Sequence, residues 1–375
     1  MDGKLESNPE DEKLARSVIE DDNAKADGNL IQEGVNQGLG AFVPETLFSN
    51  IVKNYKQAKQ LYGEKILSEV TGYSPDYVEK NAKIPEFQKE LESNIGERIK
   101  RLQKNNYISK DGIIQEKGYK LSSLVMYTQE LDQLEAKGLL GEKENKEKAH
   151  YGQRKDSDFY KKGDRYADID VMKTLKVAIR RGHTKIQAGD LKIFERESKG
   201  NLEIIYAIDA SGSMKGKKIE MSKKAGIALA YKAIENKDRV GLLAFGDRIK
   251  AKVQPTTDFT EFLEKTARIQ ANNETNFPEA IEESIRTFSQ DNNMKHLIFI
   301  TDGMPTAGED PEKEALEAIS KAVSANITVS MIGIEVQEDS AKFLREAAEI
   351  GKGKFHNVAN VEELDVIILQ DYDSQ

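Results

Sequence analysis

The chain has 375 residues, no cysteine and a formal net charge of −9 at pH 7. This acidic balance argues against a protein built mainly to bind nucleic acid. Without cysteine the chain has neither disulfides nor thiolate metal sites, which is typical of a reducing, cytoplasmic compartment. The sequence shows no apolar run of about 18 residues and no signal-peptide core, so we expect no membrane span and no export.

Residues 1–40 are polar and lack apolar periodicity, which predicts a disordered acidic tail. Residues 41–140 differ, because apolar side chains recur at helical spacing from Pro44 onward. Pro75 and Pro85 each mark a helix start. The helix that begins at Pro85 would bury one apolar stripe, made of Phe87, Leu91, Ile95, Ile99 and Leu102.

A short hairpin and a last helix complete this module. Asp111-Gly112 lies between apolar pairs and predicts a turn. A helix should follow from about Glu116 to Lys137, with Gly138 as its C-terminal cap. Such an arrangement is either a small helical bundle or a winged-helix-like module. A winged helix would suggest DNA binding, but the helix faces mix Glu with Lys and offer no basic stripe, so an interaction module is favoured.

Residues 141–168 are almost devoid of aliphatic side chains and predict a charged linker. Residues 169–200 would form a connecting arm that packs on the C-terminal domain, with a strand pair around Ile186 and 191–194. Arg180-Arg181 within this arm is a candidate for contact with an acidic partner, although surface charge is the commoner explanation.

From residue 201 to 375, strand-like and helix-like segments alternate regularly. This alternation predicts a Rossmann-like, doubly wound and mostly parallel α/β sheet with helices on both faces. The expected strands are 203–208, 239–245, 296–301, 327–334 and 354–358, with a short antiparallel edge strand at 250–253. The expected helices are 217–235, 277–289, 311–325, 339–350 and 361–369.

Acidic and hydroxyl side chains follow the ends of these strands. Asp209, Ser211 and Ser213 come directly after the first strand, Asp302 follows a later one, and Thr275 lies in a polar loop before a helix. Ligands of such sheets bind at the carboxyl ends of the strands, so we expect all five residues at one edge. Their oxygen atoms suit a hard divalent cation such as Mg²⁺. Alternatively, the serines cap the next helix and the second aspartate serves a turn.

The run Asp209-Ala210-Ser211-Gly212-Ser213, together with Thr275 and Asp302, resembles the metal-ion-dependent adhesion site (MIDAS) of von Willebrand factor A (VWA) domains. The resemblance covers roughly residues 201–375. It implies that the two serine hydroxyls bind the cation directly, that both aspartates act mainly through water or hydrogen bonds, and that the threonine binds directly or through water. An open metal position would then accept a carboxylate from a partner protein. Mg²⁺ is the expected cation, with Mn²⁺ and Ca²⁺ as alternatives.

One feature departs from the family pattern, in which glycine often precedes the loop threonine. Here Asn273-Glu274 precedes Thr275. Glu274 would either fill the open metal position or point to solvent, and the second is favoured. Asp247 lies on another loop of this edge and is expected at the rim of the site.

Residues 191–213 are similar to the same region of magnesium-chelatase D-type subunits and of intracellular VWA proteins that accompany MoxR-type AAA+ ATPases. This implies a non-enzymatic, metal-dependent adaptor that docks an acidic residue of such an ATPase or of its client. No Walker A sequence is present, so the chain itself is not expected to hydrolyse ATP. The alternatives are a chelatase D-like subunit that aids metal insertion into a cofactor or metalloenzyme, and a nucleic-acid-binding regulator.

Overall fold

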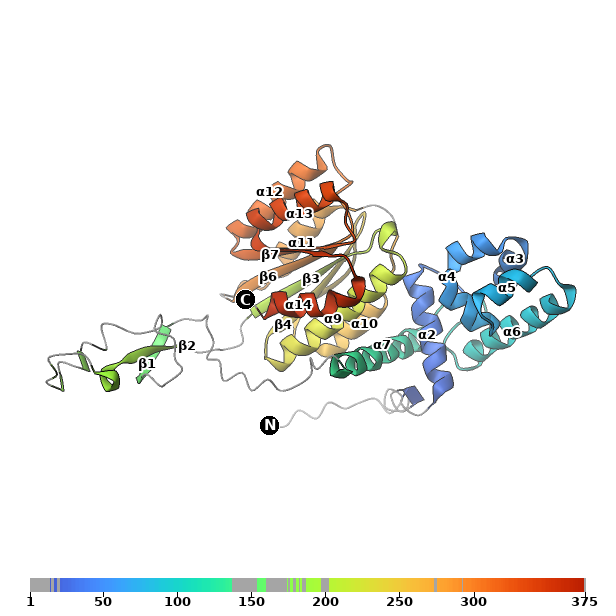
Figure 1. The fold of residues 1–375 in the computed structure, drawn as a ribbon, viewed down its shortest axis with the longest axis horizontal. Coiled ribbons are helices and arrows are strands. Elements are labelled where there is room, and N and C mark those ends of the chain that lie inside the picture. Colours follow the sequence, from blue (N-terminus) through green and yellow to red (C-terminus); the bar gives the residue numbers. More distant parts are fainter. Residues whose placement is uncertain are drawn as a thin grey trace. The chain divides into compact units, whose positions relative to one another are not determined.

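The structure is a computed structural model of the chain. It describes residues 14, 17–18, 21–136, 154–159, 174, 176–177, 180–181, 183, 187–196, 202–272, 275–291 and 293–373. The chain divides into two compact units, Met1–Leu140 with Asn201–Ser374, and Gly141–Gly200 with Gln375. The first unit holds a helical module and a sheet domain (Figure 1). None of the described helices is long and apolar enough to cross a bilayer.

The helical module confirms the mainly helical architecture expected before the sheet. It contains α2 (Asp22–Asn36), α3 (Pro44–Lys53), α4 (Tyr55–Thr71), α5 (Pro75–Asn81), α6 (Pro85–Lys104) and α7 (Glu116–Ala136). The expected apolar stripe of α6 is buried. The expected turn is also present, since Ser109 N donates to Ile113 O at 2.7 Å around Gly112, whose φ is +80°. The proposed cap at Gly138 lies outside the described residues.

The prediction of disorder throughout residues 1–40 is wrong for 22–36, which form α2. This helix buries three large apolar side chains, those of Leu30, Ile31 and Val35. Two glycines let it pack closely: a Cβ on Gly34 would lie 2.4 Å from Phe42 Cζ, and one on Gly28 would lie 2.6 Å from Val125 Cγ2. Glycine also lowers helix propensity. Gly28 and Gly34 therefore permit the close packing but make a helix over 22–36 harder to predict from the sequence.

The second unit contains a small antiparallel pair, β1 (Arg154–Phe159) with β2 (Lys192–Arg196). Beside it, Arg181 Nη1 donates to Gly189 O at 2.9 Å and to Asp190 Oδ1 at 3.2 Å. This arginine is therefore engaged within its own unit. β1 falls inside the segment predicted as a linker, and the rest of the predicted linker and arm lies largely outside the described residues.

The sheet domain has the predicted α/β fold. Its six strands run in the order β5-β4-β3-β6-β7-β8, and β5 is antiparallel to β4 while the other pairs are parallel. The strands are β3 (Leu202–Asp209), β4 (Arg239–Phe245), β5 (Ile249–Thr256), β6 (Met294–Thr301), β7 (Ile327–Ile334) and β8 (Lys352–Val358). Every residue of β3 is buried, as expected for a central strand covered on both faces.

Helices cover both faces of this sheet (Figure 1). One face carries α9 (Lys217–Glu235), α10 (Phe259–Ala267) and α14 (Leu364–Tyr372), and the other carries α11 (Phe277–Thr287), α12 (Pro311–Ser324) and α13 (Glu338–Ile350). Alternate residues of β3 serve the two cores, Ile204 and Tyr206 on the α9 side and Ile205 and Ala207 on the other. The sequence did not predict α10, which begins after the N-cap Asp258.

Candidate metal centre

The structure brings the predicted ligands to the carboxyl edge of the sheet. Asp209 ends β3, and Ser211 and Ser213 lie in the turn that follows it. Asp302 comes directly after β6. Because β3 and β6 are adjacent parallel strands in register, their ends place the two aspartates next to one another.

Hydrogen bonds join four of the five predicted residues into a row. Ser211 N donates to Asp209 Oδ1 at 2.8 Å. The Oγ atoms of Ser211 and Ser213 are 3.1 Å apart, and Ser213 Oγ donates to Asp302 Oδ1 at 2.8 Å. Neighbouring ligands of an octahedral Mg²⁺ with bonds of 2.0–2.1 Å are about 2.9 Å apart. The spacing of these side-chain oxygens is that of ordinary hydrogen bonds and is also compatible with a small hard cation.

Thr275 is buried on the same edge, but its hydrogen bonds run through its backbone. Its N–H donates to Thr306 Oγ1 at 3.2 Å, and its carbonyl accepts from Thr306 N at 3.1 Å. These bonds fasten its loop to the loop after β6, although within the described residues none connects the Thr275 hydroxyl to the serine row. Glu274 lies outside the described residues, and Asp247 is exposed in the turn between β4 and β5.

Asp209 is the buried carboxylate of the centre, with 1% of its surface exposed. Burial raises the pKa of this carboxyl to about 6. Hydrogen bonds from Thr301 Oγ1, at 2.7 Å, and from Ser211 N favour the ionised form and partly offset that rise. A cation beside it would favour the charged carboxylate further. Among the described residues no group of three or more His, Cys, Asp or Glu side chains is placed to hold a metal. A cation here would therefore depend on hydroxyl oxygens as well as carboxylates.

Two lysines that the sequence did not single out contact residues or loops of the centre. Lys218 Nζ, in the first turn of α9, donates to Asp302 Oδ2 at 2.9 Å. Lys250 Nζ, on β5, donates at 2.5 Å to both Ala210 O and Asn272 O, so it joins the loop after β3 to the loop before α11. Burial lowers the pKa of Lys250. Lysines at these positions in a sequence are indistinguishable from surface charge, and only the fold reveals their contacts.

Comparison with known protein families identifies the sheet domain. Residues 203–370 match the family model described as the von Willebrand factor type A domain. The C-terminal domain is a VWA domain. This confirms the family resemblance that was inferred from the strand-end motifs.

Relatives of known sequence or structure match up to about half of the chain. Inter alpha-trypsin inhibitor heavy chain 4 of Mus musculus is 26% identical over 143 residues, which are 35% of this chain and 15% of that protein. The chain therefore spans about 15% of the length of this curated relative. The conserved hypothetical protein BatB from Bacteroides thetaiotaomicron is 23% identical, covering 47% of this chain and 98% of that one, with a TM-score of 0.39. The manganese-loaded TRAP protein of Plasmodium vivax is 18% identical, covering 46% and 73%, with a TM-score of 0.36.

Proposed function

We propose that the VWA domain is a metal-dependent protein-binding domain. Mg²⁺ would be held by Asp209, Ser211, Ser213, Thr275 and Asp302 and would bind a carboxylate of a partner protein. The main support is the row of side-chain oxygens from Ser211 through Ser213 to Asp302, spaced at 3.1 and 2.8 Å. Mn²⁺ and Ca²⁺ are alternatives, because they also take oxygen ligands.

The chemistry of the donors suits binding rather than catalysis. When bound, the cation supplies a positive charge that attracts an acidic side chain of the partner. The serine hydroxyls would be direct ligands and both aspartates would act mainly through water, so the neutral direct ligands would leave much of that charge available to a partner carboxylate. Within the described residues, the hydroxyls of Ser211 and Ser213 contact each other and Asp302 rather than a histidine that could activate a nucleophile. We therefore assign a non-enzymatic role to the centre.

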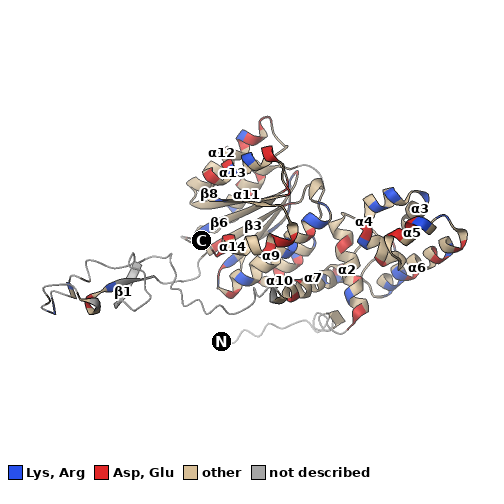
Figure 2. Ribbon diagram, viewed as in Figure 1, with Lys and Arg blue, Asp and Glu red and all other residues tan. Residues whose placement is uncertain are grey.

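The proposed partner is an AAA+ ATPase of the MoxR type, or its client, in the cytoplasm. This assignment rests on the similarity of residues 191–213 to VWA proteins that accompany such ATPases, and the lack of cysteine agrees with a reducing compartment. A chelatase D-like subunit would use the same metal centre and is the second candidate. A nucleic-acid regulator is disfavoured, because basic and acidic residues are interspersed along α3 to α6 (Figure 2) and Arg181 pairs with Asp190.

The decisive test compares wild type with Asp209→Ala and with the control Asp339→Ala, whose carboxylate is exposed on α13. Isothermal titration with Mn²⁺ should show one site in wild type and in the control, and an affinity about 10- to 100-fold weaker in Asp209→Ala. Pull-downs from native lysate in Mg²⁺ or EDTA should then retain an AAA+ ATPase only when an intact centre and Mg²⁺ are both present. Retention of the same prey in EDTA would refute metal-bridged docking.

A further inference from the structure

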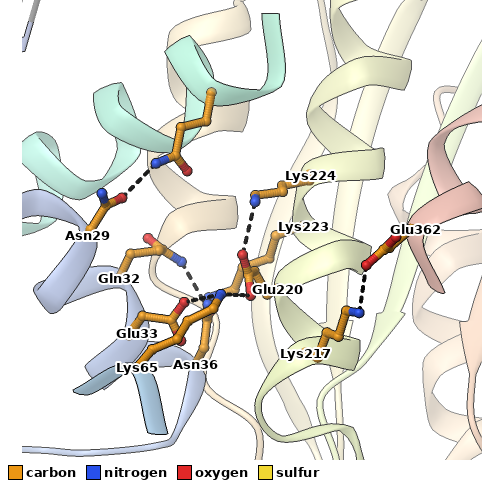
Figure 3. Close-up of polar contacts among 11 residues, drawn as sticks. Asn29, Gln32, Glu33, Asn36, Lys65, Lys217, Glu220, Lys223, Lys224 and Glu362 are labelled. Atoms are coloured by element: carbon orange, nitrogen blue, oxygen red, sulfur yellow. Dashed lines mark hydrogen bonds and ion pairs between the residues drawn. The ribbon is translucent and has the colours of Figure 1, made fainter. Parts of the chain in front are cut away.

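The C-terminal end of α2, residues 36–38, contacts the loop that carries the metal-site serines. Asn36 O accepts a hydrogen bond at 3.1 Å from Gly216 N, three residues after Ser213 in the chain. The Asn36 side chain accepts a second one, at 2.8 Å, from Nζ of Lys223 on α9 (Figure 3). Asn36 and Lys223 are both completely buried. The end of α2 is therefore fixed to the start of α9 at two points.

The same segment reaches the second loop of the metal centre. Gly38 has a φ of +72°, and a Cβ built on it would lie 3.3 Å from Ala271 O and 3.4 Å from Lys215 Cε. Ala271 begins the loop that leads to Thr275, and Asn272 N in that loop donates to the carbonyl of Ala210 at 2.8 Å. A side chain on Gly38 would therefore meet the backbone of the loop that leads to Thr275 and the side chain of Lys215 at close contact distance.

Polar and apolar contacts hold the helical module in this position. Lys65 on α4 bridges Glu33 on α2, at 2.7 Å, and Glu220 on α9, at 3.0 Å (Figure 3). This lysine is 64% exposed, so water screens the pairs and they contribute modestly. A buried apolar cluster also joins Met126 from α7 to Ile227, Leu263 and Ala267 from α9 and α10. The cluster makes docking of the module part of the folded core.

We infer that residues 36–38 are a positioning segment of the metal centre. They set the spacing between the loop of Ser211 and Ser213 and the loop of Thr275, so docking of the helical module raises the affinity of the centre for its cation. This inference rests on the proposed function, because it assigns the module a role at the same centre. Coupling between two sites is reciprocal, so a bound cation must in turn stabilise the docked end of α2.

Two glycine substitutions form a matched test in the full chain. Gly38 and Gly72 have φ values of +72° and +77°, so valine strains both backbones alike, but the nearest atom to a Cβ on Gly72 is Asn94 Nδ2 at 3.8 Å, within the helical module. Mn²⁺ affinity is measured by electron paramagnetic resonance. We expect Gly38→Val to weaken Mn²⁺ binding about five-fold or more, while Gly72→Val binds like wild type.

Hydrogen–deuterium exchange of the wild type provides a second measurement that needs no variant to fold. Mg²⁺ should slow exchange in peptides from the C-terminal half of α2 and leave peptides of α6 unchanged. Equal Mn²⁺ affinities of the two glycine variants, or protection confined to the metal-site loops, would overturn the coupling and leave the proposed function standing. A wild type that binds no Mn²⁺ would overturn both.

Discussion

Asp209 and Asp302 are held in different ways, although both belong to the metal centre. Asp209 is buried below the serines and receives hydrogen bonds from Thr301 and from the backbone of Ser211. Asp302 instead pairs with Lys218 and accepts from Ser213. The first carboxylate is thus fixed by neutral donors in a low-dielectric setting, where the loss of one donor is costly.

Replacing Thr301 by valine tests this dependence at constant shape. The change leaves Asp209 Oδ2 without the hydroxyl that lies 2.7 Å away. We expect the free energy of unfolding in urea at pH 7 to fall by about 1–3 kcal/mol. Thr328→Val, at a half-buried position of β7, is the control and should stay within about 0.5 kcal/mol of wild type. Similar losses in the two variants would show that the Thr301 hydroxyl has no special role.

Lys223 predicts a pH dependence of stability. Burial lowers the pKa of its ammonium to about 7 from 10.5, so between these values the unfolded chain holds a proton that the folded chain has released. The contribution of this group to stability therefore rises with pH across that window, by up to about 1.4 kcal/mol per pH unit. Urea unfolding at pH 7, 8 and 9 should show that the free energy of unfolding of wild type rises with pH relative to that of Lys223→Met. A pH-independent difference between wild type and Lys223→Met would contradict this.

At the scale of elements, the strands of the sheet domain were predictable, whereas β1, α2 and α10 were not. A central parallel strand such as β3 is a nearly continuous apolar run, and a sequence shows this directly. The apolar residues of α2 are interrupted by Gly28 and Gly34, whose value lies in contacts with Val125 and Phe42 that appear only after folding. α10 is a nine-residue helix beside an edge strand, too short for a clear periodicity.

The metal centre likewise has residues that the sequence predicted and contacts that it did not. Four of the five proposed ligands were recognisable because they follow strand ends within short motifs, and the fifth, Thr275, because it lies in a polar loop just before a helix. The supports from Lys218, Lys250 and residues 36–38 act across long sequence separations, and no local pattern marks them.

The packing of α9 against β3 gives a prediction for a single helix. A Cβ on Gly226 would lie 2.6 Å from Cε1 of Tyr206, a fully buried ring whose hydroxyl donates to Ser222 O at 2.7 Å. Gly226→Ala should therefore lower the melting temperature, with a loss of about 1–3 kcal/mol from overpacking. Gly96→Ala in α6 has open space around the new methyl and should be stabilising by about 0.5–1 kcal/mol. Stability changes of the same sign in Gly226→Ala and Gly96→Ala would contradict overpacking at Gly226.

At the scale of the first unit, the helical module and the VWA domain share one buried cluster. Met126 contributes to it from the module and is 1% exposed. We expect one cooperative unfolding transition for α2 to α7 together with the sheet domain.

Met126→Ala tests that expectation, because it leaves a cavity in the shared cluster and should cost about 2–5 kcal/mol. The control is Ile113→Ala, since Ile113 is 52% exposed and should cost little. Circular dichroism melts and limited proteolysis would monitor the unfolding of the helical module and of the sheet domain. Two separate transitions in wild type, or no difference between the two variants, would show that the parts fold independently.

The bond between Asn36 and Lys223 also has a consequence for how the protein is made, because these residues are 187 positions apart. At a translation rate of about 5–20 residues per second, α9 is synthesised about 10–40 seconds after the end of α2. During that time the face of α2 that α9 later contacts is exposed to water, and it carries the polar side chains of Gln32, Glu33 and Asn36. The contacts of the helical module with the metal-site loops therefore form only when translation has passed α9.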